Sequence, residues 1–228
     1  MSDKSIWYLE NLDVGNLFCS NKMSNNIDAD RVKQLKKSDY VYLPDEESDA
    51  IYFIIEGRVK IGSISEDGKE ITKTILNRGE VFGELVLIGE NKRRDYAIAL
   101  EDTRICCINS AQMKNLIKDH SSLSMFFMKM MGSKVIEMEN RLESLVFKDS
   151  RSRIVEYLTE LVEKRGQRVG YEWVIRNFIT HQEIANITAT SRQTVTTVLN
   201  ELRTAEIITF NRKRLLIRDL DKLKSEVK

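Results

Sequence analysis

Cysteine and histidine are scarce in this chain of 228 residues, which has three cysteines and two histidines. An odd cysteine count in a chain of this length argues against a disulfide framework. Cys106 and Cys107 are neighbours in a β-rich run, so their side chains point to opposite faces of a sheet and cannot bind one metal together. With only Cys19, His120 and His181 besides, the sequence offers no zinc site. We interpret the cysteines as unreactive, because free cysteine usually behaves as a small hydrophobe.

A long apolar stretch is also absent from the start of the chain. Residues 1–10 mix acidic and basic side chains with apolar ones, unlike a signal peptide or a membrane span. The expected location is therefore the cytoplasm, with no membrane partner. Hydrophobic residues make up 42% of the chain, which is enough to bury a core, and the length favours two domains.

The net charge of +1 conceals an uneven distribution. Residues 151–228 contain 15 lysines and arginines against 10 aspartates and glutamates, whereas the rest of the chain has a net charge of −4. A basic carboxyl-terminal third on an acidic body indicates contact with a polyanion. Chance variation is the alternative, and charge alone does not decide between the two.

Short strands are expected throughout residues 39–109. Regular spacing and glycine turns, of which Asp67-Gly68 is the strongest hairpin signal, predict a closed antiparallel β-structure within an amino-terminal domain of residues 1–120. The predicted strands are Tyr40–Leu43, Ile51–Ile55, Arg58–Ser65, Glu70–Leu76 and Tyr96–Leu100.

Helical periodicity follows the strands, with a short helix near residues 112–118 and a long one over residues 121–148. Apolar residues recur along the long helix at alternating spacings of three and four, which is the a/d seam of a coiled coil. The seam residues are Met128, Met131, Val135, Met138, Leu142 and Leu145. We interpret this helix as the dimerisation helix of a homodimer. Its other face, with Phe127 and Ile136, could pack on the β-domain of the same chain.

Two helix starts lie ten residues apart in the carboxyl-terminal domain, residues 149–228. Thr180-His-Gln-Glu183 and Thr190-Ser-Arg-Gln193 both fit the capping box, in which threonine accepts from a backbone N–H and glutamate or glutamine reaches back. A helix over residues 151–165 precedes them and is expected to end with Gly166 as its C′ residue. Such closely spaced helices leave room only for a tight turn, which predicts a helix-turn-helix.

The second of these helices has an apolar and a polar face. The apolar stripe is Val195, Val198, Leu199 and Leu202, and the polar face is Gln193, Thr196, Thr197 and Asn200. Arg192 at the amino end can bond both O6 and N7 of guanine, glutamine can pair with adenine, and a threonine methyl can contact a thymine methyl. The alternative is an ordinary helical hairpin whose polar face is merely solvated.

A hairpin with a basic tip is predicted beyond this helix. Ile207–Phe210 and Leu215–Ile217 are expected strands, and Asn211–Arg214 between them includes Lys213. Such a wing suits contact with DNA phosphates. The expected fold class is α+β: an amino-terminal β-roll, a long dimerisation helix and a carboxyl-terminal winged helix-turn-helix.

The run Ile179-Thr-His-Gln-Glu-Ile-Ala185, followed by Ser191-Arg-Gln-Thr-Val195, resembles the helix-turn-helix of the CRP/FNR family of bacterial transcription regulators. The resemblance implies binding to double-stranded DNA at a palindromic operator, with RNA polymerase as a further partner. It implies that Arg192 and Gln193 read base edges and that Ser191 and Thr194 anchor phosphates. The full set of residues expected at the DNA is Thr180, Gln182, Ser191, Arg192, Gln193, Thr194, Thr197 and Lys213.

Two residues depart from the family pattern. Gln193 stands where the family has glutamate, which puts the base preference in question. Ala189 stands where the family has a turn glycine, so it must adopt an unfavourable backbone conformation or form a different turn.

The predicted β-roll resembles the cyclic-nucleotide domains of this family, in which the run Gly79–Leu85 is similar to the phosphate-binding cassette. An arginine ten residues past the glutamate would meet an anionic phosphate, and here that residue is Arg94. The implied effector site is Gly83, Glu84, Leu85, Arg94, Asp95 and Met138. Alternatively, the cassette residues only maintain the fold.

The identity of the effector is left open. A cyclic nucleotide is one candidate, but cyclic AMP is disfavoured, because Asp95 adds a carboxylate and could hold Arg94 in an internal ion pair. Met138 and Glu139 also replace the hydroxyl residues that the family presents to adenine. An iron-sulfur cluster is excluded because the amino-terminal region has only Cys19, and a haem because no axial-ligand motif is present.

The leading hypothesis is a homodimeric DNA-binding transcription regulator controlled by a small-molecule effector. A regulator controlled only by its abundance is the alternative, and a cyclic-nucleotide-binding regulatory subunit of an enzyme is the least favoured reading. The chain itself is expected not to be an enzyme, because no nucleophile–base pair or metal cluster is present.

Overall fold

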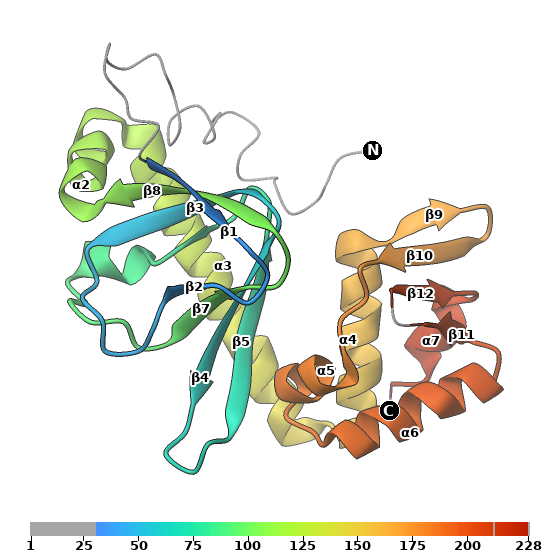
Figure 1. The fold of residues 1–228 in the computed structure, drawn as a ribbon. Coiled ribbons are helices and arrows are strands. Elements are labelled where there is room, and N and C mark those ends of the chain that lie inside the picture. The colour runs from blue at the N-terminus through green and yellow to red at the C-terminus, as the bar shows by residue number, and fades with distance from the viewer. Residues whose placement is uncertain (1–30, 212, 228) are drawn as a thin grey trace. The chain divides into compact units, whose positions relative to one another are not determined.

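The computed structural model describes residues 31–211 and 213–227, so that Cys19 and the rest of the first thirty residues lie outside the described part. The chain forms two compact units, one ending at Gly132 and the other beginning at Ser133 (Figure 1). Within the described ranges, no helix is long and apolar enough to cross a membrane.

The first unit is built from two four-stranded antiparallel sheets, which confirms the predicted β-roll (Figure 1). The first sheet contains, in spatial order, β1 (Val32–Leu35), β8 (Thr103–Asn109), β3 (Ala50–Glu56) and β6 (Val81–Phe82). The second contains β2 (Tyr40–Tyr42), β7 (Tyr96–Ala99), β4 (Arg58–Ile64) and β5 (Glu70–Asn77). All five predicted strands are present, and β8 contains the β-rich run noted around Cys106 and Cys107, whereas β1 and β6 were not predicted.

The turn between β4 and β5 follows the Asp67-Gly68 signal. Gly68 has a φ of +79°, a left-handed conformation that glycine adopts without a steric penalty. The Ser65 amide donates to the carbonyl of Lys69 at 3.0 Å, which closes the hairpin. This turn therefore sets the register in which Ile64 faces Glu70.

Two hydrophobic clusters fill the first unit. One lies between the sheets and includes the stacked rings of Tyr52 and Phe82, whose centroids are 5.0 Å apart. The other lies where β3 and β8 meet the helices α2 (Ser110–Asp119) and α3 (Ser121–Phe147). The buried residues that the helices contribute are Met113, Leu123, Phe126, Phe127 and Met130. Each such side chain contributes roughly 1.5–3 kcal/mol by leaving water, so the start of α3 is fixed on the β-roll.

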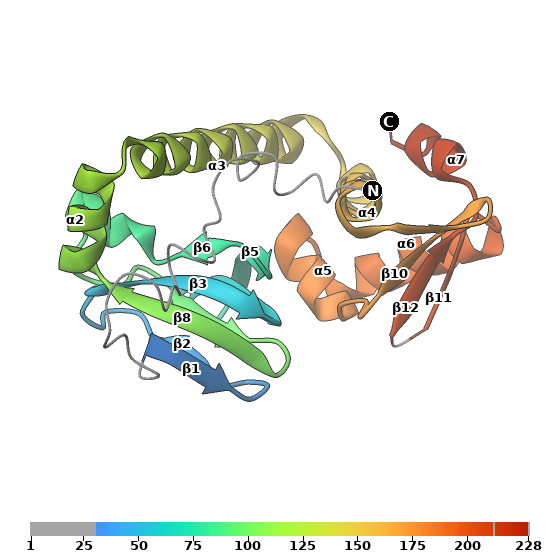
Figure 2. The same ribbon diagram turned by 90° about the horizontal axis from the view of Figure 1, so that it is seen from above.

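The long helix α3 is uninterrupted (Figure 2), and its buried residues all lie between Leu123 and Met130. Phe127 is buried in its own unit, as expected for a residue off the seam. The same expectation was wrong for Ile136, which is 59% exposed. Five of the six predicted seam residues, all except Met131, are largely exposed apolar side chains.

The second unit combines helices with a four-stranded antiparallel sheet of order β11-β12-β10-β9 (Figure 1). Its helices are α4 (Ser150–Arg165), α5 (His181–Thr188), α6 (Arg192–Thr204) and α7 (Leu220–Ser225). Its strands are β9 (Gln167–Val169), β10 (Glu172–Arg176), β11 (Ile208–Phe210) and β12 (Arg214–Ile217). The helix-turn-helix and the wing strands were predicted, whereas β9, β10 and α7 were not.

Gly166 ends α4 but not in the expected way. Its φ is −64°, so it is not the left-handed C′ residue that the sequence suggested. A side chain at this position would place its Cβ 2.5 Å from the carbonyl oxygen of Val162. Glycine is needed here because of this close approach rather than because of its backbone freedom.

Candidate DNA-binding surface and effector site

The helix-turn-helix begins with the predicted capping box. The Thr180 Oγ1 atom accepts from the Glu183 amide at 3.2 Å, and the Glu183 carboxylate accepts from the Thr180 amide at 2.8 Å. Two amides that α5 leaves without intrahelical partners are satisfied in this way. Thr180 thus fixes the start of α5, and its neighbour Gln182 is exposed and bonded to Asn186.

The turn between α5 and α6 bends through Ala189, whose φ and ψ are +50° and +49°. This is the unfavourable left-handed conformation that the sequence allowed as one of two outcomes. The second helix start was predicted one residue too early. Ser191, not Thr190, is the N-cap, and its Oγ accepts from the Thr194 amide at 3.0 Å. Thr190 instead has its hydroxyl 2.9 Å from that of Thr188.

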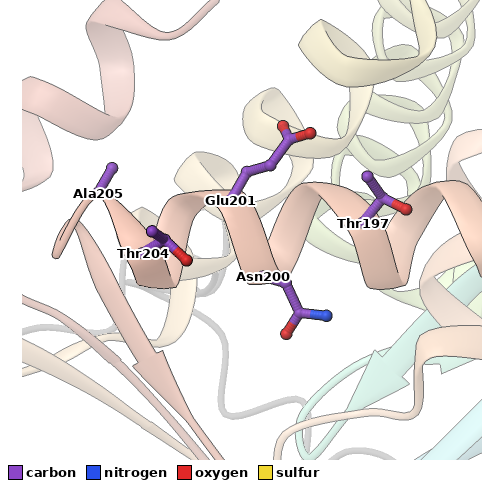
Figure 3. A pocket seen from close by; sticks show the side chains of 5 residues that line it. All are labelled: Thr197, Asn200, Glu201, Thr204 and Ala205. Atoms are coloured by element: carbon purple, nitrogen blue, oxygen red, sulfur yellow. The ribbon is translucent and has the colours of Figure 1, made fainter.

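The two faces of α6 differ as the sequence predicted. The residues of the apolar stripe, Val195, Val198, Leu199 and Leu202, are all buried. Arg192, Gln193 and Thr197 are exposed, and a shallow hollow continues along the same helix, lined by Thr197, Asn200, Glu201, Thr204 and Ala205 (Figure 3). A row of exposed polar side chains above a fully buried stripe is the form of a helix that reads a major groove.

Thr196 is the exception on the polar face. It is half-buried, its hydroxyl donates to the Arg192 carbonyl at 2.9 Å, and it lies 2.9 Å from Nδ1 of His181. Thr196 therefore joins α6 to the start of α5, and it does not present a free hydroxyl to a ligand.

His181 is a part of this surface that sequence reasoning missed. Its ring packs in a T-shaped arrangement with the ring of Phe210 in β11, with the centroids 5.7 Å apart. Burial, followed by the positive charge of Arg192, lowers the pKa of His181 below its ordinary value. The available signal was its position as the first residue of a capped helix, next to a predicted reading helix.

The predicted wing is formed by β11 and β12. The Asn211 Oδ1 atom accepts from the amides of Lys213 and Arg214, both at 2.9 Å, which shapes the tip of the hairpin. Lys213 is exposed at this tip. The guanidinium of Arg203, in α6, lies 5.3 Å from the ring centroid of Phe210, so the wing packs against the reading helix.

In the first unit, the predicted cassette forms a sharp turn into a short 3₁₀-helix, Glu84–Ile88. Gly83 has a φ of +78°, and a Cβ there would lie 2.9 Å from Nη1 of Arg93. Glu84 is buried and Leu85 is partly buried. The cassette residues thus form one turn, and their part in an effector site stays a prediction.

The arginine beside this turn is Arg93, not Arg94. Arg93 is 5% exposed and donates to the carbonyls of Ala50 and Gly83 at 2.6 and 3.2 Å. Its guanidinium also lies 4.4 Å from the ring centroid of Tyr42. The side chain of Arg94 is 69% exposed, and its nearest carboxylate is that of Glu90, at 4.0 Å. Counting ten residues from Glu84 therefore identified the exposed member of an arginine pair.

Asp95 lies near the same turn, but its ion pair differs from the one expected. Its carboxylate bonds the Lys73 ammonium at 3.0 Å and accepts from the Tyr42 hydroxyl at 3.3 Å. The expected internal partner, Arg94, is not bonded to it. Burial first, and then the Asp95 charge, raise the pKa of Tyr42 far above its ordinary value.

The remaining predicted effector residue, Met138, is on the part of α3 that belongs to the second unit and is highly exposed. Its membership in an effector site stays a prediction. Within residues 31–211 and 213–227, no three histidine, cysteine, aspartate or glutamate side chains gather as a metal site would require.

Known proteins share both units. Residues 32–120 match the family model of the cyclic nucleotide-binding domain, and residues 152–226 match that of the Crp-like helix-turn-helix domain. The cyclic AMP receptor protein of Thermus thermophilus is 30% identical over 153 residues, which cover 67% of this chain and 68% of that protein. The global nitrogen regulator of Nostoc sp. is 28% identical over 188 residues, covering 82% of this chain and 84% of that protein.

The fold agrees with these matches. A solved structure of CooA from Carboxydothermus hydrogenoformans superimposes with a TM-score of 0.75 at 28% identity, covering 87% of this chain and 88% of that one. The two domain matches follow the order that the sequence predicted, and the fold agrees with both of them. Together they identify the protein family. The chain belongs to the CRP/FNR family and is a DNA-binding transcription regulator.

Proposed function

We propose that this regulator acts as a homodimer on a palindromic operator and that its β-roll receives a small-molecule effector. The observation that carries the DNA-reading part is the exposed row of Arg192, Gln193 and Thr197 above a buried apolar stripe. Arg192 would read guanine and Gln193 adenine, while Ser191 and Thr194 at the helix start and Lys213 in the wing would contact phosphates.

Selection from randomised DNA tests this proposal directly. Two copies related by a two-fold axis should enrich a palindrome whose half-sites are about one helical turn apart. Failure to enrich any sequence would contradict the proposal, and so would a single asymmetric half-site.

The relatives are transcription regulators, which supports RNA polymerase as a further partner and the cytoplasm as the location.

The dimer is supported by exposed apolar residues at the seam positions of α3. Met128, Val135, Met138, Leu142 and Leu145 are between 49% and 70% exposed. Exposed apolar side chains in a regular row are typical of a contact surface, and the alternating spacing of three and four residues favours a second copy of the same helix.

In the β-roll, the guanidinium beside the cassette turn is that of Arg93, which could contact an anionic effector. Its Nε–H is buried without a hydrogen-bond partner in the structure, next to the turn at Gly83. We therefore transfer the proposed effector contact from Arg94 to Arg93. Asp95 adds a carboxylate near this site, and Met138 and Glu139 replace the hydroxyl residues that the family presents to adenine, so cyclic AMP is expected to bind weakly.

A regulator without an effector is the second candidate. It is favoured by the internal bonds of this region, where Arg93 holds two backbone carbonyls and Asp95 holds Lys73. Calorimetry with a panel of nucleotides and other small anions separates the two candidates. Saturable binding that is lost in Arg93→Ala but kept in Arg94→Ala supports an effector, whereas DNA binding that no compound changes supports control by abundance.

A further inference from the structure

Arg153, in the first turn of α4, donates hydrogen bonds to three backbone carbonyls at once. Its Nη1 atom donates to Lys148, which follows the last residue of α3, at 2.9 Å. Its Nε and Nη2 atoms donate to Thr188 and Ala189 at 3.0 and 3.2 Å. One side chain thus joins the end of α3 to the turn of the helix-turn-helix.

The carbonyls of Thr188 and Ala189, which accept two of these hydrogen bonds, need a donor from outside α5. Thr188 is the last residue of α5, where helix carbonyls lack intrahelical partners and the helix dipole is negative. Ala189 has a φ of +50°, which residues with a side chain rarely adopt. A guanidinium that bonds both carbonyls favours the conformation in which they point toward it.

The conformation of Ala189 has a direct consequence for DNA reading. The turn sets the direction of α6, and Arg192 and Gln193 begin that helix only three and four residues later. Because recognition helices contact bases mainly through their amino-terminal residues, a small change in this turn displaces both side chains. Contacts to phosphates elsewhere on the surface depend less on it.

We propose that Arg153 is a positioning residue for the recognition helix. It keeps the turn at Ala189 in its left-handed conformation and makes the end of α3 and the turn a single unit. Its loss therefore reduces the preference for the operator over other DNA, rather than the overall affinity for DNA. This inference rests on the proposed DNA-reading function.

The first test compares Arg153→Lys with Arg151→Lys. Both changes keep the charge and lie in the same helical turn, but Arg151 bonds the carboxylates of Glu201 and Glu226 and not the turn. Lysine at position 153 cannot reproduce the fork of bonds. The ratio of operator to random-DNA affinity should fall about tenfold in Arg153→Lys, the size of one weakened base contact. It should stay within about twofold in Arg151→Lys.

The second test uses Ala189→Gly. Glycine adopts the left-handed conformation without a steric penalty, so the turn no longer needs Arg153. In the Arg153→Lys background, Ala189→Gly should restore most of the operator preference, whereas in the wild-type background it should change that preference by less than about twofold. A role of Arg153 in general stability alone would not give this coupling.

Two results would overturn the inference: an unchanged operator preference in Arg153→Lys, or equal effects of Ala189→Gly in both backgrounds. If Arg153→Lys does not fold, the double variant decides: folding with operator preference supports the inference, and folding without it refutes it. A wild-type protein that prefers no DNA sequence would refute the proposed function instead.

Discussion

The DNA-reading surface and the β-roll site differ in what their polar side chains bond to. On α6, Arg192 and Gln193 are exposed, and the polar side chains around them serve the helix starts. In the β-roll, Arg93 and Asp95 are bonded to other parts of the same chain. A binding surface built from free side chains can be recognised from its motif, whereas a site whose side chains bond one another depends on the tertiary structure around it.

The largest expected effect is the loss of operator affinity when the proposed dimer, which would bring two α6 helices to one operator, is disrupted. Met138→Glu with Leu142→Glu places charge at two seam positions, and burying unpaired charge is costly. The double variant should be monomeric in ultracentrifugation, and its operator affinity should fall about 100-fold or more, because the second half-site is no longer tethered.

A matched control is Ile136→Glu, at an exposed position off the seam. This variant should remain dimeric. If the double variant also stays dimeric, α3 is not the dimer interface, and the two reading surfaces are not joined through it.

The next prediction sharpens the contrast within the arginine pair. Arg93→Ala removes the hydrogen bonds that Arg93 donates to two backbone carbonyls, and it should lower the free energy of unfolding by about 2 kcal/mol. Arg94→Ala removes an exposed side chain and should change it by less than about 0.5 kcal/mol. Urea unfolding of both variants measures the difference, and equal destabilisation would show that Arg93 does not have the structural role described.

The smallest expected effect is a pH dependence from His181. Burial and the charge of Arg192 keep its pKa in the folded chain below the ordinary value of 6.5. As the pH falls through this range, the unfolded chain binds a proton before the folded chain does, so the stability contributed by neutral His181 is lost. The melting temperature should therefore decrease between about pH 7.5 and about pH 5.5.

The variant His181→Gln keeps hydrogen-bonding groups near Thr196 but does not titrate in this range. Part of the decrease should disappear in this variant. An unchanged decrease would assign the pH dependence to other groups, such as the carboxylates.

Local signals predicted the helix-turn-helix well. The capping box at Thr180 and the apolar stripe of α6 depend on neighbouring residues only, and both are present. The second helix start was displaced by one residue because the Thr188 hydroxyl lies against that of Thr190, which leaves Ser191 to cap the helix. Contacts between helices, such as His181 with Thr196, have no signature in the sequence.

The β-roll site was less predictable because its side-chain directions depend on segments that are distant in the sequence. The Arg93 amide donates to Glu46, and its carbonyl accepts from Asp45, and this pairing turns its side chain inward. Counting residues from Glu84 cannot reveal such a pairing. The partner of Asp95, Lys73, lies on β5, 22 residues earlier in the chain.

Binding-site selection with Arg192→Ala and Lys213→Ala tests the central claim, that α6 reads bases while the wing contacts phosphates. Arg192→Ala should weaken binding to the preferred palindrome by about 1–3 kcal/mol per contact and relax specificity at one base pair of each half-site. Lys213→Ala should instead weaken all sequences alike and reduce the salt dependence by about one counterion per subunit. If Arg192→Ala keeps the wild-type base preference at every position, α6 does not read DNA through this residue.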